Sequence, residues 1–316
     1  MVKKRHFIIV MGILLALFIV GSFFDKQINQ AIYMRNNAFS VIFGAFGTYP
    51  CYAGLAFIAG GLIGTSVKRK DLHIFWKIFS IALAVFGYIV SVWLGSNDIP
   101  SINGFNNPKL EIPAYIVGAV IFGGVGFLGF WFCSKGNKEQ LWKALLVMAF
   151  IYTVGLLPVS FLIKLFIHRP RYRILVYSGE LPFYYWWETC KFYKDYIKEH
   201  IGLEISGVYM TEDILKEEFK SFPSGHSGAG AVMMMFLPYF SMIFKKLKGK
   251  ETMMFYIGFA FAVIMMFSRM LAGAHYLTDV CMGALLLMVV YFTTHVFAAK
   301  RGWIFADEKN DVEPKE

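Results

Sequence analysis

The chain has 316 residues, of which 57% are hydrophobic and only 16% are charged, well below the roughly 25% charged residues of an ordinary soluble domain. The apolar residues occur in unbroken blocks of about 20, the length that a helix needs to cross a bilayer, which excludes an ordinary soluble protein. The formal net charge of +10 comes from short basic clusters between these blocks, a pattern typical of membrane topology rather than of nucleic-acid binding.

The apolar blocks predict an all-α fold, a polytopic integral membrane bundle of about eight transmembrane helices. The predicted spans are residues 7–24, 50–67, 74–95, 112–132, 141–166, 224–244, 252–268 and 279–299. A basic stretch precedes the first block, as in a signal peptide, but no small-residue cleavage site follows it, so we expect a retained span. Segment 25–49 mixes charged and apolar residues, and we interpret it as lying flat in the interface, outside this count.

The basic clusters predict the orientation of the chain. Because they flank alternate spans, they all fall on one side: residues 3–5, 68–70, 135–138, 245–250 and 300–301. Lys and Arg mark the cytoplasmic side of a membrane protein. We therefore expect both termini in the cytoplasm and the connections 96–111, 169–223 and 269–278 outside. The short loops favour a bacterial cytoplasmic membrane.

The loop 169–223 is the only polar segment long enough for a small subdomain, and its aromatic run 183–187 suits the headgroup region. We expect N-terminal transmembrane helices at 1–140, a core domain at 141–300 that includes this loop, and a disordered cytoplasmic tail at 301–316. The cysteines have neither disulfide nor metal-site spacing and are interpreted as packing residues. They are Cys51, Cys133, Cys190 and Cys281.

Two clusters of non-apolar residues stand at the outer ends of the fifth and sixth spans. The first contains Lys164, Arg169 and Arg171, and taken alone it is best explained by a snorkelling lysine with interfacial arginines. In the second, Ser224 can cap a helix and Gly225 lets a ligand approach its backbone, just before His226. The N–H groups and positive dipole end of a helix start favour phosphate without a metal. A helix cap with a spectator histidine is the alternative.

The third cluster spans the turn between the last two spans and contains Arg269, His275 and Asp279. His275 and Asp279 are four residues apart, so on a helix they share a face. If Asp279 accepts the Nδ1–H of His275, the other ring nitrogen is left unprotonated, as a nucleophile requires. A satisfied polar pair at a helix end is the alternative interpretation.

Taken together, the three clusters offer what phosphoryl transfer needs: cations for the phosphoryl charge, helix-end N–H groups for its oxygens, and two histidines for nucleophilic and acid roles. The cations are Lys164, Arg169, Arg171 and Arg269. Cations gathered in one place repel each other when no anion joins them, which argues against a purely structural assembly.

These clusters resemble the signature of the type 2 phosphatidic acid phosphatase family, which shares its site with vanadium haloperoxidases. The signature reads K-x6-R-P, P-S-G-H and S-R-x5-H-x3-D. The matching residues are Lys164 and Arg171, then residues 223–226, then Ser268, Arg269, His275 and Asp279. The resemblance covers about 141–300 and implies a catalytic core of six helices, which leaves two helices of this chain without an assigned role.

One position departs from the signature. The proline expected after the motif arginine is Tyr172, while Arg169 and Pro170 supply an Arg-Pro pair two residues early. Either arginine is therefore a candidate phosphate ligand, and the spacing from Lys164 favours Arg171.

The resemblance implies that His275 attacks phosphorus, His226 protonates the leaving group and Asp279 orients His275. It assigns the phosphoryl oxygens to Lys164, Arg171, Ser224, Gly225 and Arg269, with Arg169 as a further candidate. It implies no metal and no other cofactor, because the side-chain cations neutralise the phosphoryl charge.

The expected function is that of a membrane phosphatase, which hydrolyses a phosphomonoester or diphosphate of a lipid at the outer face through a phosphohistidine. A transferase that passes the phosphoryl group or phospho-headgroup to a second acceptor shares the first half-reaction and stays an alternative. A transporter is less favoured, because its charged residues would line a path within the helices. The residues do not distinguish a polyprenyl diphosphate from phosphatidate, phosphatidylglycerol phosphate or a phosphorylated glycolipid, and they do not indicate the oligomeric state.

Overall fold

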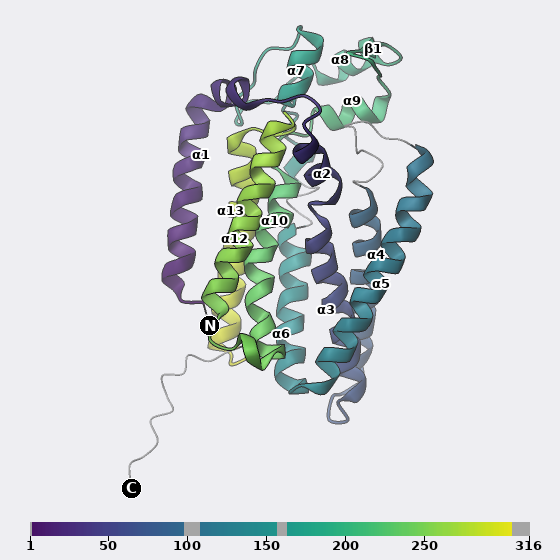
Figure 1. Cartoon of the computed structure of the whole chain (residues 1–316), viewed down its shortest axis with the longest axis vertical. Helices are drawn as coiled ribbons and strands as arrows, with labels where there is room; N and C mark the ends of the chain where they lie inside the picture. Colours follow the sequence, from purple (N-terminus) through teal and green to yellow (C-terminus); the bar gives the residue numbers. More distant parts are fainter. Residues whose placement is uncertain (1, 98–107, 157–162, 305–316) are drawn as a thin grey trace.

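The computed structural model describes residues 2–97, 108–156 and 163–304, and it shows a bundle of long helices with a small helical cap at one end (Figure 1). The bundle contains α1 (Lys4–Ile32), α2 (Ala38–Phe46), α3 (Tyr49–Lys68), α4 (Ile74–Asn97), α5 (Glu111–Lys135), α6 (Lys138–Phe150), the π-helix η2 (Ile151–Leu156), α10 (Gly225–Phe236), α12 (Glu251–Leu271) and α13 (Leu277–Lys300). The prediction of an all-α membrane bundle is confirmed.

Seven segments within the described residues are long and apolar enough to cross a membrane. They correspond to seven of the eight predicted spans, although residues 157–162 of the predicted span 141–166 lie outside the described part. The eighth prediction, 224–244, is a broken helix. It consists of α10, the 3-10 turn η5 (Leu237–Tyr239) and α11 (Phe240–Ile243). The interruption falls at Pro238, which has no backbone N–H to continue the helix.

The interpretation of segment 25–49 as a flat interfacial stretch is wrong. Helix α1 continues to Ile32, and α2 packs against α12 before the chain enters α3. The buried face of α1 is a single seam whose members recur every three or four residues. These residues are Phe7, Val10, Leu14, Phe18, Gly21, Asp25 and Asn29. The polar residues that suggested an interfacial stretch instead extend this seam into the bundle, where they have polar partners.

The two ends of the bundle differ in charge. The start of α1, the α3–α4 and α5–α6 connections and the end of α13 lie at the lower end in Figure 1. These helix ends and connections carry basic clusters, so basic residues gather at one end of the bundle, as predicted. The cap lies at the opposite end. Which end faces the cytoplasm stays a prediction, and so do the domain boundaries.

The cap is built from residues of the polar loop 169–223. It contains α7 (Tyr172–Ser178), α8 (Tyr193–His200), the antiparallel pair β1 (Glu204–Ile205) and β2 (Val208–Tyr209), and α9 (Glu212–Glu218). A separate apolar cluster of buried side chains, among them Leu215 and Phe219, packs inside it. Two backbone hydrogen bonds close its base, from Ser221 N to Arg169 O at 3.1 Å and from Arg171 N to Glu218 O at 2.8 Å.

Candidate active site

The three polar clusters of the sequence meet at the capped end of the bundle. The backbone N–H of Ser224 donates to Asp279 O at 3.0 Å, which joins the start of α10 to the start of α13. The N–H of Arg173 donates to Gly273 O at 3.0 Å, which joins the first cluster to the connection between α12 and α13. Residues as far as 100 positions apart in the sequence therefore meet at one site.

His275 lies in the connection between α12 and α13 and is buried. Its Nδ1 is 2.6 Å from the carbonyl oxygen of Ser221. Because a carbonyl can only accept, Nδ1 carries the hydrogen and Nε2 is left unprotonated. Burial lowers the pKa of His275 to about 3, and the positive charges of Arg171 and Lys164 act in the same direction. The imidazole is therefore neutral at physiological pH, as a nucleophile must be.

The predicted hydrogen bond from His275 Nδ1 to Asp279 is absent. The nearest carboxylate oxygen of Asp279 is 3.8 Å away, which is within reach of an ion pair but too far for a hydrogen bond. The prediction assumed that both residues share one helix, but α13 begins at Leu277 and His275 precedes it. The helical spacing of four therefore does not apply to this pair.

Asp279 instead binds the groups around His275. Its carboxylate accepts hydrogen bonds from the backbone N–H of Tyr276 at 2.8 Å, from the Ser221 hydroxyl at 2.5 Å and from Nη1 of Arg169 at 2.6 Å. The first of these bonds caps α13, where a carboxylate also complements the positive end of the helix dipole. Asp279 thus holds both Ser221 and the peptide that follows His275.

Arg169 is fully buried and donates four hydrogen bonds. Besides Asp279, its guanidinium donates to Asp25 at 2.9 Å, to the Thr278 hydroxyl at 2.9 Å and to the carbonyl of Tyr184 at 2.9 Å. Its Cζ lies 3.9 Å from the centre of the Tyr276 ring. The protein thus uses four of the five N–H groups of this guanidinium, which argues against the further phosphate role considered from the sequence.

Arg171, in contrast, is held loosely. Its guanidinium nitrogens lie 3.5 Å from Glu217 and 3.6 Å from Glu218, and its Nε has no hydrogen-bond partner among the described residues. Glu218 is bound more closely by Arg173, at 2.9 Å. Burial lowers the pKa of Arg171, and the positive charge of Arg173 adds to this effect. A buried guanidinium with only distant carboxylates is suited to receiving an anion.

Helix α2 brings Arg269 and His226 together. A Cβ atom on Gly44 would lie 2.6 Å from Nη1 of Arg269, so a larger residue here would move the guanidinium from its present place against this helix. The carbonyl of Gly44 also lies 3.2 Å from Nε2 of His226 and accepts its hydrogen. Arg269 is buried in the last turn of α12. Helix α2, which belongs to the segment 25–49 predicted to lie outside the bundle, therefore forms one wall of the site.

The start of α10 has the predicted cap. Ser224 is the N-cap residue, and its hydroxyl accepts from the N–H of Ser227 at 3.3 Å and from the Ser227 hydroxyl at 3.0 Å. Gly225 is the first residue of the helix. The positive end of α10 therefore points to the same region as His226 and His275. Lys164 lies in the short 3-10 helix η4 (Ile163–Leu165), and its charge acts on His275.

Sequence reasoning missed four residues that support the site: Asp25, Asn29, Ser221 and Glu218. Asp25 and Asn29 continue the apolar seam of α1 at a spacing of four, and this pattern could have placed them inside the bundle. Ser221 contributes its backbone carbonyl to His275, and no sequence pattern marks such a role.

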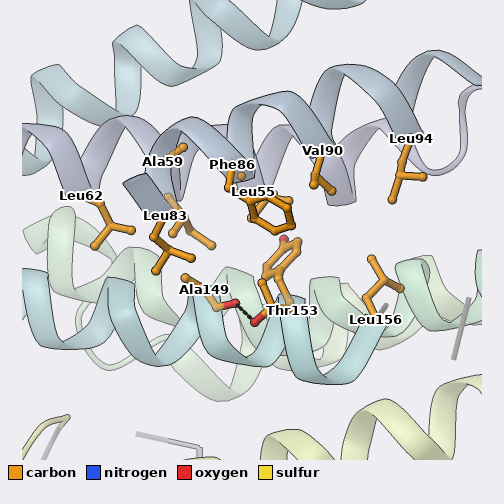
Figure 2. Close-up of a pocket in the computed structure, with 13 residues that line it drawn as sticks. Leu55, Ala59, Leu62, Leu83, Phe86, Val90, Leu94, Ala149, Thr153 and Leu156 are labelled. Atoms are coloured by element: carbon orange, nitrogen blue, oxygen red, sulfur yellow. Dashed lines mark hydrogen bonds between the residues drawn. The ribbon is translucent and has the colours of Figure 1, made fainter. Parts of the chain in front are cut away.

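An apolar pocket lies apart from these polar groups, between α3, α4 and the α6–η2 segment (Figure 2). Its lining includes Leu55, Leu83, Val90 and Leu94. The hydroxyl of Thr153 in its wall donates to the carbonyl of Ala149 at 3.0 Å, so the helix satisfies this group. The pocket suits hydrocarbon and does not suit phosphate.

A sequence model of the PAP2 superfamily matches residues 140–303, just over half of the chain. The match contains all three polar clusters and excludes α1 to α5. No curated protein and no solved structure matches the chain.

Proposed function

The chain belongs to the PAP2 superfamily, and on this basis we propose that it hydrolyses the phosphate ester or anhydride of a lipid through a phosphohistidine at His275. The superfamily consists generally of phosphatases, and several long apolar helices make this member a multi-pass membrane protein. The observation that carries the proposal is the buried His275 imidazole, whose Nδ1 donates to Ser221 O while Arg171 and Lys164 lie near it.

In the proposed first step, Nε2 of His275 attacks phosphorus and the bond from phosphorus to the leaving oxygen breaks. His226, in its imidazolium form, donates a proton to that oxygen and becomes neutral, so that the lipid leaves as an alcohol or a lower phosphate. The phosphoryl oxygens are held by Lys164, Arg171, Arg269, Ser224 and Gly225. These groups neutralise the charge of the transferring group.

The attack makes the His275 ring cationic, since Nε2 is then bonded to phosphorus while Nδ1 keeps its hydrogen. Two features support stabilisation of this cation. The Ser221 carbonyl accepts the Nδ1–H at 2.6 Å, and the Asp279 carboxylate lies 3.8 Å from the same nitrogen. In the second step water attacks phosphorus with His226 as the base, and the P–N bond breaks to release phosphate and neutral His275.

The substrate class follows from the surroundings of the site. The polar groups lie at the end of an apolar bundle, where a lipid headgroup would meet them while its hydrocarbon stays in the membrane. We place this end at the outer, periplasmic face, because the basic clusters gather at the other end.

The test is phosphate release from a panel of lipid phosphates and diphosphates by the detergent-purified chain, with EDTA present and no added alcohol. We expect release with at least one lipid and none from His275→Ala. Loss of activity in EDTA that magnesium or zinc restores would overturn the metal-free reaction. Turnover only after an acceptor alcohol is added would identify a phosphotransferase instead.

A further inference from the structure

The last turns of α1 contact the connection that carries His275, although α1 lies outside the matched superfamily region. Asp25 and Asn29 are spaced four residues apart and share one face of α1, and Tyr33 is the C-cap residue that follows this helix. In that order they contact Thr278, His275 and Gly273. The end of α1 and its C-cap residue thus contact two positions of the connection and the first turn of α13.

The contact of Asn29 is with the peptide of His275 itself. Its Nδ2 donates to the carbonyl oxygen of His275 at 3.1 Å, and the amide is fully buried. Its Oδ1 has no hydrogen-bond partner among the described residues. An unpaired buried oxygen opposes folding, so this amide is better explained by its effect on His275 than by a contribution to stability.

Asp25 fixes the other side of the connection. Its carboxylate accepts from the backbone N–H of Thr278 at 3.1 Å, from the Thr278 hydroxyl and from Nη2 of Arg169 at 2.9 Å. The same guanidinium binds Asp279. One arginine is therefore shared by a carboxylate of α1 and a carboxylate of α13, and it links the first helix of the chain to the carboxylate that lies 3.8 Å from His275.

Gly273 closes the third contact. It has a left-handed backbone with φ of +61°, and a Cβ atom on it would lie 2.8 Å from the ring of Tyr33. The connection is therefore pressed against α1 at a point where only glycine fits.

We infer that Asp25 and Asn29 are positioning residues that hold His275 with Nε2 in line for attack on phosphorus. This inference rests on the proposed function. The phosphate-holding groups come from other elements, so loosening α1 should affect the attack while leaving phosphate binding nearly unchanged.

The experiment compares Asn29→Ala with Leu14→Ala in the detergent-purified full chain. Leu14 is buried on the same seam of α1, more than ten residues before the site, so its truncation weakens the packing of α1 without touching the connection. We expect Asn29→Ala to lower kcat on lipid phosphate on the order of tenfold to a hundredfold, with KM changed less than about twofold, because small misplacement of a reacting group is costly. Leu14→Ala should lower Tm and leave kcat nearly unchanged.

A second readout does not depend on turnover. Vanadate can bond to Nε2 of a well-placed His275 and take the five-coordinate shape of the transition state, whereas inorganic phosphate forms no such bond. We expect Asn29→Ala to weaken vanadate binding about tenfold while phosphate binding changes less than about twofold. The isosteric Asn29→Asp should behave like Asn29→Ala, because a carboxylate cannot donate to the His275 carbonyl.

The outcomes separate the two proposals. A wild-type chain that releases no phosphate from any lipid overturns the proposed function. Equal vanadate affinity of the wild type and Asn29→Ala overturns the positioning role, whether or not the wild type is active. The positioning role is also overturned if Asn29→Ala and Leu14→Ala both lose kcat in the same proportion to their fall in Tm.

Discussion

Arg169 and Asp279 form an ion pair of 2.6 Å in which neither side chain is exposed to solvent. The pair shows why two arginines separated by one residue have different surroundings. Pro170 separates them, and Arg171 is the N-cap residue of α7. Arg169 enters the bundle between two carboxylates, while Arg171 stays beneath α9 with only distant partners.

We predict that replacing Arg169 lowers stability, whereas replacing Arg171 lowers activity. Arg169→Ala leaves Asp25 and Asp279 as buried carboxylates without their cation, which should cost about 3–5 kcal/mol of stability and appear as a large fall in Tm. Arg171→Ala should keep Tm close to that of the wild type but lower kcat/KM by the equivalent of about 2–4 kcal/mol, through a lost phosphate contact. Thermal unfolding and steady-state kinetics measure both effects. A stable Arg169→Ala protein with the larger kinetic defect would show that Arg169 is the phosphate ligand.

The two histidines should separate with an aryl phosphate as substrate. A nitrophenolate leaves readily without a proton, whereas a lipid alkoxide needs one. We therefore expect His226→Ala to be almost inactive on lipid phosphate but to give a measurable burst of aryl alcohol. His275→Ala should give no product from either substrate, because no leaving group compensates for a missing nucleophile. A burst from His275→Ala with none from His226→Ala would reverse the assigned roles.

Stability should depend on pH through His275. Its pKa is 6.5 in an exposed state and about 3 in the folded protein, because burial disfavours the charged ring. The unfolded chain therefore binds more protons between these values, and stability falls as pH falls below about 6.5. From pH 7.5 to 5 the loss assigned to this residue is about 2 kcal/mol.

The variant His275→Asn should lack this part of the pH dependence while keeping a side-chain donor for Ser221 O. Thermal unfolding of both proteins from pH 7.5 to 5 measures the difference. If the two proteins lose Tm in parallel, His275 is not buried in its neutral form.

The orientation prediction can be checked with single cysteines. Lys198 on α8 and Lys246 at the opposite end are both exposed, and the four native cysteines are all buried. In a background without native cysteines, an impermeant thiol reagent added to intact cells should label a cysteine at position 198 and not one at position 246. The reverse pattern would place the site on the cytoplasmic side.

The polar clusters could be found in the sequence because each lies within a short segment and has a chemical reason to be at a helix end. The partners of His275 could not. The Ser221 carbonyl belongs to the backbone, which has no sequence signature, and Asn29 lies 246 positions before His275. Asp25 directly follows an apolar block, and a charged residue in such a place is typical of the membrane interface. Only the folded structure shows that Arg169 lies beside Asp25, and this buried partner offsets the cost of burying the Asp25 carboxylate.

The two hydrogen bonds that close the base of the cap, Ser221 N to Arg169 O and Arg171 N to Glu218 O, have a consequence for how such a protein can diversify. These two bonds hold Arg169, Arg171 and Ser221 in place without relying on most of the chain that forms the cap between them. The stretch from Tyr193 to Thr211 lies beyond Tyr184, whose carbonyl holds Arg169, and it can lengthen, shorten or be exchanged while the base stays closed. New substrate selectivity can be introduced there, by evolution or by an engineer, without rebuilding the site below.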